Sequence, residues 1–125
     1  MSTLKLDTLS NKAGTASVPS DTIVSGTAKA WVNFNGTGTV AIRRAFNVSS
    51  ITDEGTGNYT VNFTTAMQDS DYAVVGAAGE GASSLRVVCA NYNLAAPTTT
   101  AARIQTPYAN GALADVPYVN VAFMR

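Results

Sequence analysis

The sequence contains no histidine, a single cysteine and few charged residues. Histidine is the commonest general base and metal ligand in proteins, so its absence excludes a Ser-His-Asp triad and the usual histidine-containing metal centres. Cys89 has no second cysteine with which to pair, and the apolar run LRVVCAN around it favours a buried thiol over a nucleophile. We therefore expect no catalytic residue, no metal and no cofactor.

Long apolar segments and an excess of positive charge are also missing. No run approaches the roughly 18 apolar residues of a membrane-spanning helix, and the first residues lack the apolar core of a secretory signal. Eight Lys and Arg residues balance eight Asp and Glu residues, whereas nucleic-acid binders neutralise phosphates with a basic excess. We therefore expect neither membrane insertion nor a nucleic-acid partner.

The residues that are abundant favour β-structure. Thr and Val suit a pleated, half-buried surface, and period-two alternation recurs from Lys29 onward with a turn signal about every ten residues. The clearest case is GNYTVNFTT, in which Tyr59, Val61 and Phe63 alternate with polar residues. No segment shows helical periodicity over ten residues. The sequence predicts an all-β fold, an antiparallel β-sandwich of about seven short strands with an extended N-terminal arm. The segments that carry these strands are KAWVNFN, TVAIR, AFNVSSI, GNYTVNFTT, DYAVVGAA, SLRVVCANY, TAARIQT and YVNVAFMR.

The glycine-rich stretch NGTG at residues 35–38 predicts a hairpin rather than a phosphate-binding loop. Phosphate loops open a helix, whereas TVAIR, a strand, follows this one, and Asn35-Gly36 tolerates the positive φ of tight hairpin turns. Trp31 points away from the core in this pattern, and we expect it to contact a neighbouring subunit. The residues expected in the core around this hairpin are Ala30, Val32, Phe34, Val40, Ile42, Phe46, Val48 and Ile51.

Residues 1–26 differ in composition from the rest and form a separate unit from the predicted β-domain at residues 27–125. The segment NKAGTASVPSD has the small and polar residues of a linker, and the whole stretch has too little apolar surface to fold alone. It is either a disordered tail or an arm that becomes ordered against a partner, and its apolar residues favour an arm. We expect assembly contacts from Leu4, Leu6, Leu9, Ile23 and Val24.

Two groups of residues are candidates for chemistry or recognition. Asp69 and Asp71 could be the paired carboxylates of a glycosidase, but their place at a polar strand entry without an aromatic platform nearby favours ordinary loop positions. The later loops, ANYNLAAPTTT and TPYANGALADVPY, carry Tyr and Asn side chains of the kind that stack on sugars and form hydrogen bonds. Alternatively, Tyr118 is a strand residue and Tyr108 packs on the core. The receptor-contact candidates are Tyr92, Asn93, Tyr108 and Asn110.

Residues 28–67, AKAWVNFNGTGTVAIRRAFNVSSITDEGTGNYTVNFTTAM, resemble a segment that recurs in the tail fibres and virion tip proteins of bacteriophages, notably cyanophages and marine phages. The preceding LDTLSNKAGTASVPSDTIV resembles the strip that usually precedes it, so the resemblance covers residues 1 to about 75. It implies a homotrimeric, non-enzymatic, virion-attached module.

On this resemblance we expect a structural virion protein, a tail fibre or tip. Its arm would attach to tail or baseplate proteins and its β-domain would contact a host polysaccharide or outer-membrane component. Family members usually carry the module at the end of a longer chain, whereas this sequence is short. The difference leaves open a trimeric capsid decoration protein as the alternative. A polysaccharide depolymerase is the less favoured alternative.

Overall fold

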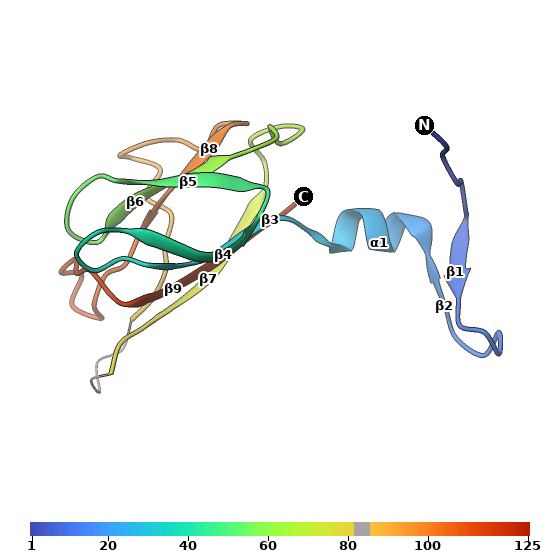
Figure 1. Cartoon of the computed structure of the whole chain (residues 1–125), viewed down its shortest axis with the longest axis horizontal. Coiled ribbons are helices and arrows are strands. Elements are labelled where there is room, and N and C mark those ends of the chain that lie inside the picture. The colour runs from blue at the N-terminus through green and yellow to red at the C-terminus, as the bar shows by residue number, and fades with distance from the viewer. Residues whose placement is uncertain (82–85) are drawn as a thin grey trace.

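The chain is described here by a computed structural model that covers residues 1–81 and 86–125. A seven-stranded domain forms one end of the molecule, and a hairpin followed by a short helix projects from it (Figure 1). In chain order the elements are β1 (Thr8–Ser10), β2 (Ser17–Pro19), α1 (Ser20–Gly26), β3 (Ala28–Asn35), β4 (Ala41–Phe46), β5 (Val48–Asp53), β6 (Asn58–Phe63), β7 (Ala73–Gly79), β8 (Ala101–Gln105) and β9 (Tyr118–Met124).

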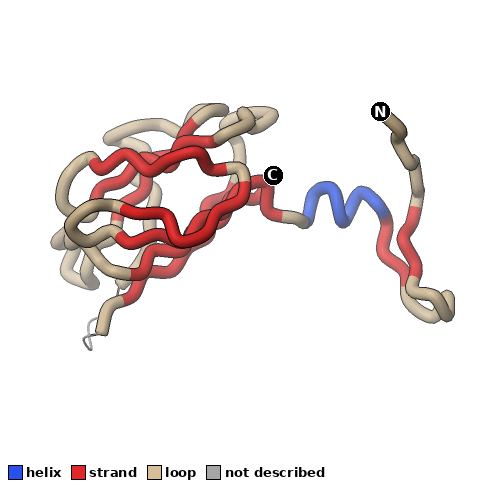
Figure 2. The backbone as a smooth tube through the Cα atoms, in the orientation of Figure 1, coloured by secondary structure: helices blue, strands red, loops and turns tan. Residues whose placement is uncertain are grey.

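The expected all-β fold is confirmed. Every strand pairing is antiparallel, and the strands form three sheets in the orders β1-β2, β4-β3-β9-β7 and β5-β6-β8 (Figure 2). The helix α1 was not expected, because its seven residues are too few to produce a periodicity over ten. The expected strand SLRVVCANY is only partly visible: its first residues lie outside the described ranges, and Arg86 and Cys89 form isolated bridges.

The core lies between the four-stranded and the three-stranded sheet. The alternating residues that we expected to be buried on β3 and β6 are buried, and they face each other. Edge-to-face aromatic pairs join the two layers, with 5.1 Å between the ring centroids of Phe34 and Tyr59 and 5.0 Å between those of Phe63 and Phe123. The buried apolar strand residues are Ala30, Val32, Phe34, Tyr59, Val61, Phe63, Ala102, Ile104, Val119, Val121 and Phe123.

Two residues expected in the core are exposed. Phe46 is 55% exposed because it pairs with Trp31, and residues paired across strands share a face, here the outer one. Ile42 is 37% exposed because β4 is an edge strand whose inner side is only partly covered. Val48 and Ile51, by contrast, are partly buried against the core, as is Val40.

Asn47 is the corner at which the chain passes from one sheet to the other, so that the expected strand AFNVSSI is divided into β4 and β5. Its φ of +54° is a conformation that Asn tolerates better than most residues. Its side-chain amide donates to the carbonyl oxygens of Lys29 and Thr65, both at 3.1 Å, and its Oδ1 accepts from the Thr65 N–H at 2.8 Å. One side chain thus fixes the crossing between the layers.

The predicted β3–β4 hairpin forms, but with a longer turn than Asn35-Gly36 alone. Asn35 pairs with Ala41, so residues 36–40 make the loop, and the positive φ falls at Gly38. Gly36 is needed for another reason: a Cβ there would lie 2.4 Å from the hydroxyl oxygen of Tyr59. The glycine therefore lets the buried Tyr59 reach the loop.

We expect Tyr59→Phe to lower the free energy of unfolding by about 1–3 kcal/mol. The Tyr59 hydroxyl lies 2.9 Å from two acceptors, the Gly36 carbonyl and Asp115 Oδ1, and the substitution leaves both without this donor. Urea unfolding measures the change, with Tyr92→Phe as the control because Tyr92 is exposed. A Tyr59→Phe protein as stable as the control would show that this contact does not hold the loops.

Candidate functional site

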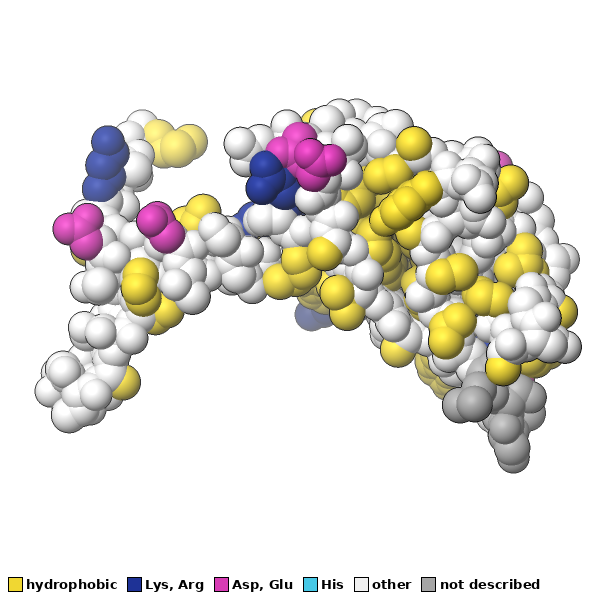
Figure 3. Space-filling model, turned by 180° about the vertical axis from the view of Figure 1, so that it is seen from behind, with side chains coloured by type: hydrophobic (Ala, Val, Ile, Leu, Met, Phe, Trp, Pro, Cys, Tyr) yellow, Lys and Arg dark blue, Asp and Glu magenta, His cyan; other side chains and the backbone are white. Residues whose placement is uncertain are grey.

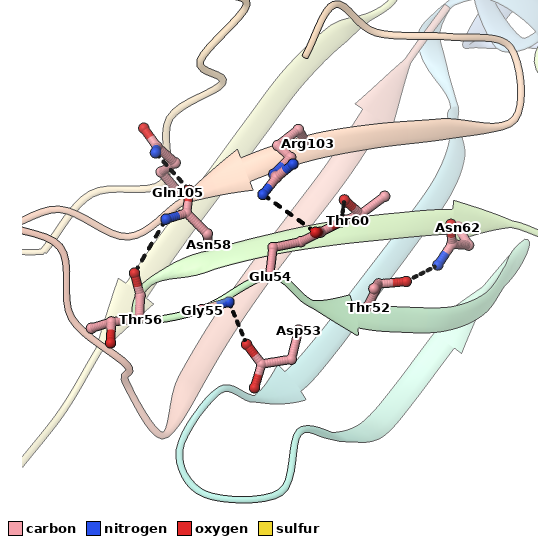
Figure 4. A network of polar contacts seen from close by, with 10 residues as sticks. All are labelled: Thr52, Asp53, Glu54, Gly55, Thr56, Asn58, Thr60, Asn62, Arg103 and Gln105. Atoms are coloured by element: carbon pink, nitrogen blue, oxygen red, sulfur yellow. Dashed lines mark hydrogen bonds and ion pairs between the residues drawn. The ribbon is translucent and has the colours of Figure 1, made fainter. Parts of the chain in front are cut away.

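The outer face of the three-stranded sheet is polar, and its side chains are paired with one another (Figure 4). Thr60 Oγ1 donates to Glu54 Oε1 at 2.7 Å, and Arg103 lies 3.5 Å from the other carboxylate oxygen of Glu54. Gln105 Nε2 donates to Asn58 Oδ1 at 2.6 Å. Glu54 is exposed and Asn58, Thr60 and Arg103 are half-buried, whereas Gln105 is buried and, in the described part of the chain, the Arg103 Nε is without a hydrogen-bond partner. Most polar groups of this face are therefore paired within the sheet and compatible with contact with water.

The outer face of the four-stranded sheet is different in character. Phe46, Trp31, Ala122 and Val75 are successive partners across β4, β3, β9 and β7, and we call these four residues the apolar row. Trp31 is 36% exposed and Val75 is 60% exposed. A shallow groove lies between Trp31 and Val75, with Ala122 in its lining. Four apolar side chains in line across a sheet form a contiguous patch, the kind of surface that marks an interaction site.

The amides of Asn33 and Asn120 border the apolar row and are hydrogen-bonded to each other across β3 and β9. Beyond them, the guanidinium of Arg43 lies 4.6 Å from the ring centroid of Tyr118, which is a β9 residue with an exposed side chain. Polarity therefore increases along this face away from the arm.

The arm leaves most of its apolar side chains uncovered. Leu4 is 82% exposed and Val24 is 64% exposed, while Ile23 is half-buried. The space-filling view shows hydrophobic side chains on the arm and on the domain, and few charged side chains on this side of the domain (Figure 3). The expected assembly residues Leu4, Leu6, Leu9 and Val24 are therefore accessible to a partner.

The junction between arm and domain is held by hydrogen bonds around the end of α1. Thr27 Oγ1 donates to the Ile23 carbonyl at 2.9 Å, and the Lys29 ammonium donates to the Val24 carbonyl and, at 3.2 Å, to Thr27 Oγ1. These bonds connect the last turn of the helix to the start of β3. These bonds help to fix the orientation of α1, and with it the arm, relative to β3.

The first candidate recognition loop is a turn anchored by Asn91. The Asn91 amide donates to Gln105 Oε1 at 3.0 Å, and its Oδ1 accepts from the Asn93 N–H at 3.2 Å. Tyr92, Asn93 and Leu94 follow this anchor, and all three are exposed, Tyr92 to 57%. A fixed base with an exposed aromatic ring, an amide and an aliphatic side chain is suited to binding a partner with mixed polarity.

The second candidate loop is a tight turn around Gly111, in which φ is +86° and the Tyr108 N–H donates to the Ala112 carbonyl at 2.8 Å. Asn110 is exposed and its Oδ1 accepts from the Ala112 N–H. The ring of Tyr108 is half-buried beneath the Arg86 guanidinium, 3.2 Å from the centroid. One face of the Tyr108 ring is therefore covered by Arg86 and is not accessible to a ligand.

The two loops do not form one site. Cys89 pairs with Gln105 in an antiparallel bridge, with backbone bonds of 3.0 and 2.8 Å in the two directions. In an antiparallel pair, the residues that follow each partner run in opposite directions. Tyr92 and Tyr108 therefore lie on opposite sides of this bridge, and only the Asn91-anchored turn presents a free aromatic side chain.

Asp69 and Asp71 do not form a pair of facing carboxylates. The Arg125 Nε–H is shared between the two Asp69 carboxylate oxygens, at 2.7 and 2.9 Å, and the Arg125 Nη2 also donates to Asp69 Oδ2. The Asp71 N–H donates to Asp69 Oδ1 at 2.9 Å. Arg125 and the Asp71 N–H lower the pKa of the Asp69 carboxyl below its ordinary value. A general acid needs the opposite shift, so this carboxylate is suited to holding the C-terminus in place.

Within residues 1–81 and 86–125, no group of three or more Cys, Asp or Glu side chains is placed to hold a metal ion. No helix in these ranges is long and apolar enough to cross a membrane.

Sequence reasoning found Trp31 but missed the rest of the apolar row. Its members come from four strands, and only the register of the pairings brings them into line. β7, AVVGAAG, consists of apolar residues and glycine, so alternation does not show which of its side chains point outward.

We expect Asp69→Asn to destabilise the protein at neutral pH and to have little effect in acid. A carboxyl with a lowered folded-state pKa contributes stability that is fully present above its unfolded pKa of about 3.9 and is lost as the pH falls through the folded pKa. Melting temperatures of variant and wild type against pH measure this, with Asp7→Asn in the arm as the control. A difference that persists at the lowest pH would contradict the ion-pair role of Asp69.

Comparisons with protein-family models, with curated proteins and with solved structures find no match to this chain. The likeness of residues 28–67 to phage fibre segments therefore stays a prediction from the sequence, and the role of the surfaces above is inferred from their chemistry.

Proposed function

We propose that the chain is a structural, non-enzymatic virion protein, a bacteriophage tail fibre or tail-tip subunit. The observation that carries the proposal is the arm, which projects from the domain (Figure 1). Its leucine side chains are exposed. An arm of this kind loses conformational entropy without burying apolar surface unless a partner covers it. The fibre-like residues 28–67 support the same assignment.

In this proposal the arm attaches the protein to tail or baseplate proteins and the domain assembles as a homotrimer. The apolar row supports the second part, because Trp31, Phe46 and Val75 lie exposed on one face, where a neighbouring copy would exclude water from them. The polar face of the three-stranded sheet then remains in contact with solvent. This division agrees with the sequence-based expectation that Trp31 contacts a neighbouring subunit.

The proposed host-facing element is the turn that presents Tyr92, Asn93 and Leu94. Its ligand would be a polysaccharide or an outer-membrane component of the host, since an exposed tyrosine ring stacks on sugar rings and an amide bonds to hydroxyl groups. The Asn91 anchor holds the turn before binding, which reduces the entropy lost on contact.

Antibody labelling of intact virions tests the location. Antibodies raised against the purified protein should label the tail end in electron micrographs. Labelling over the whole head would overturn the tail assignment in favour of a capsid decoration protein. No labelling of virions would overturn the virion assignment itself.

We expect the double variant Tyr92→Ala, Asn93→Ala to bind host cells about tenfold more weakly than wild type, the change that loss of one interface anchor of about 1.4 kcal/mol produces. Fluorescently labelled full-length protein and a titration of host cells give the affinities. Thr39→Ala is the matched control, an exposed residue in the β3–β4 loop. If the double variant binds as well as the control, this turn is not the receptor contact.

A further inference from the structure

β7 is an edge strand of the four-stranded sheet with little to protect it from pairing. Its sequence, AVVGAAG, has neither a charged residue nor a proline. The opposite edge, β4, carries Arg43 and Arg44, and charged side chains on an edge discourage the addition of another strand. The β8 edge of the other sheet is covered by the two Cys89–Gln105 backbone bonds. Among these three edges, β7 therefore offers the readiest place for a further strand.

The exposed side of β7 is also apolar and open. Val75 and Ala77 point to the outer face, opposite Ala122 and Asn120 of β9, and both are exposed. In the part of the chain that the structure describes, the backbone of β7 has hydrogen bonds only to β9. Unpaired N–H and C=O groups along a strand edge are a template for an added strand.

The chain contains a segment with the matching properties. Residues 2–7, STLKLD, are exposed, lie outside the helix and strands, and alternate Leu4 and Leu6 with polar residues. Alternation of this kind is the pattern of a strand that buries one face. Among the described residues, the Asp7 carbonyl accepts from the Ser20 N–H at 2.9 Å, and the backbone groups of residues 2–6 have no hydrogen-bond partner. The segment therefore has a strand pattern without a partner strand, whereas β7 has a sheet edge without a further strand.

Within one copy these two elements lie far apart. The N-terminus is at the outer end of the arm and β7 lies in the domain (Figures 1 and 2). The bonds from Thr27 and Lys29 to the last turn of α1 keep the arm directed away from its own domain. The segment is therefore presented to another molecule.

We propose that residues 2–7 of one copy add to β7 of a second copy as a fifth strand. Leu4 and Leu6 then lie on the outer face beside Val75 and Ala77 and extend the apolar row.

The contact joins two different surfaces, so it is heterologous, and it closes into a ring when the rotation between successive copies closes, as in the proposed trimer. This contact uses Leu4 and Leu6 and leaves the exposed Leu9 and Val24 of the arm for the proposed tail or baseplate proteins. It depends on β7 and residues 2–7 alone and stands whether or not the protein belongs to a virion.

Disulfide trapping between co-expressed copies tests the contact. All chains carry Cys89→Ser, so that one chain with Leu6→Cys and a second, differently tagged chain with Val75→Cys have one thiol each. Neighbouring residues on adjacent strands come within disulfide range. We expect a disulfide-linked heterodimer between the Val75→Cys chain and a chain that carries either Leu6→Cys or Leu4→Cys. When Ala41→Cys replaces Val75→Cys, we expect the yield of this heterodimer to fall about tenfold. Ala41 is the matched control because it is exposed on β4, the opposite edge of the same sheet. Equal trapping at the two edges, or none at Val75, would overturn the proposal.

A second measurement leaves Cys89 in place. Ala77→Lys puts a charge on the β7 edge, and Ala41→Lys puts the same charge on β4; both alanines are exposed, so both variants should fold. Dilution monitored by gel filtration should show self-association weakened about tenfold by Ala77→Lys and unchanged by Ala41→Lys. Equal weakening by both variants, or no weakening by Ala77→Lys, would overturn strand addition at β7. Because purified protein is used, virion labelling tests the proposed function separately.

Discussion

Burial of one face of each sheet against the other is the constraint on which the rest of this structure depends. The chain has neither a disulfide nor a described metal site to hold the layers together. Phe34 packs edge-to-face on Tyr59 at one end, and Phe63 packs in the same way on Phe123 at the other. The Tyr59 hydroxyl then fixes the β3–β4 loop through Gly36, and Asn47 holds the crossing between the layers. Apolar burial supplies the driving force, and a few placed polar groups select the geometry.

The same constraint leaves two outer faces, and their chemistry differs. The β5-β6-β8 face carries polar side chains already paired with one another, whereas the β4-β3-β9-β7 face carries the apolar row. The arm adds a second uncovered apolar surface that a single copy leaves in contact with water. The apolar row, which ends at the edge strand β7, and the strand-like segment of the arm are the physical basis of the proposed self-assembly. The proposed virion role is supported by the uncovered arm and by the likeness of residues 28–67 to phage fibre segments.

Local patterns predicted the parts of the fold that depend on one strand at a time. Alternation placed the inner residues of β3 and β6 correctly and directed Trp31 outward. The position of Phe46 was wrong because it depends on the register between β3 and β4 and on the corner at Asn47, neither of which alternation specifies. For the same reason the apolar row was not predicted as a unit. The recognition loops were found by composition, but the opposite directions of Tyr92 and Tyr108 follow from the Cys89–Gln105 bridge, a pairing between residues 16 positions apart in sequence.

The central claim is that this chain completes its surface with other copies of itself. Sedimentation equilibrium of the purified full-length protein over a range of micromolar concentrations measures this most directly. We expect a particle with three times the mass of one chain, which dissociates on dilution. A single species with the mass of one chain at every concentration would contradict it, because the arm and the apolar row would then be stable in water without a partner.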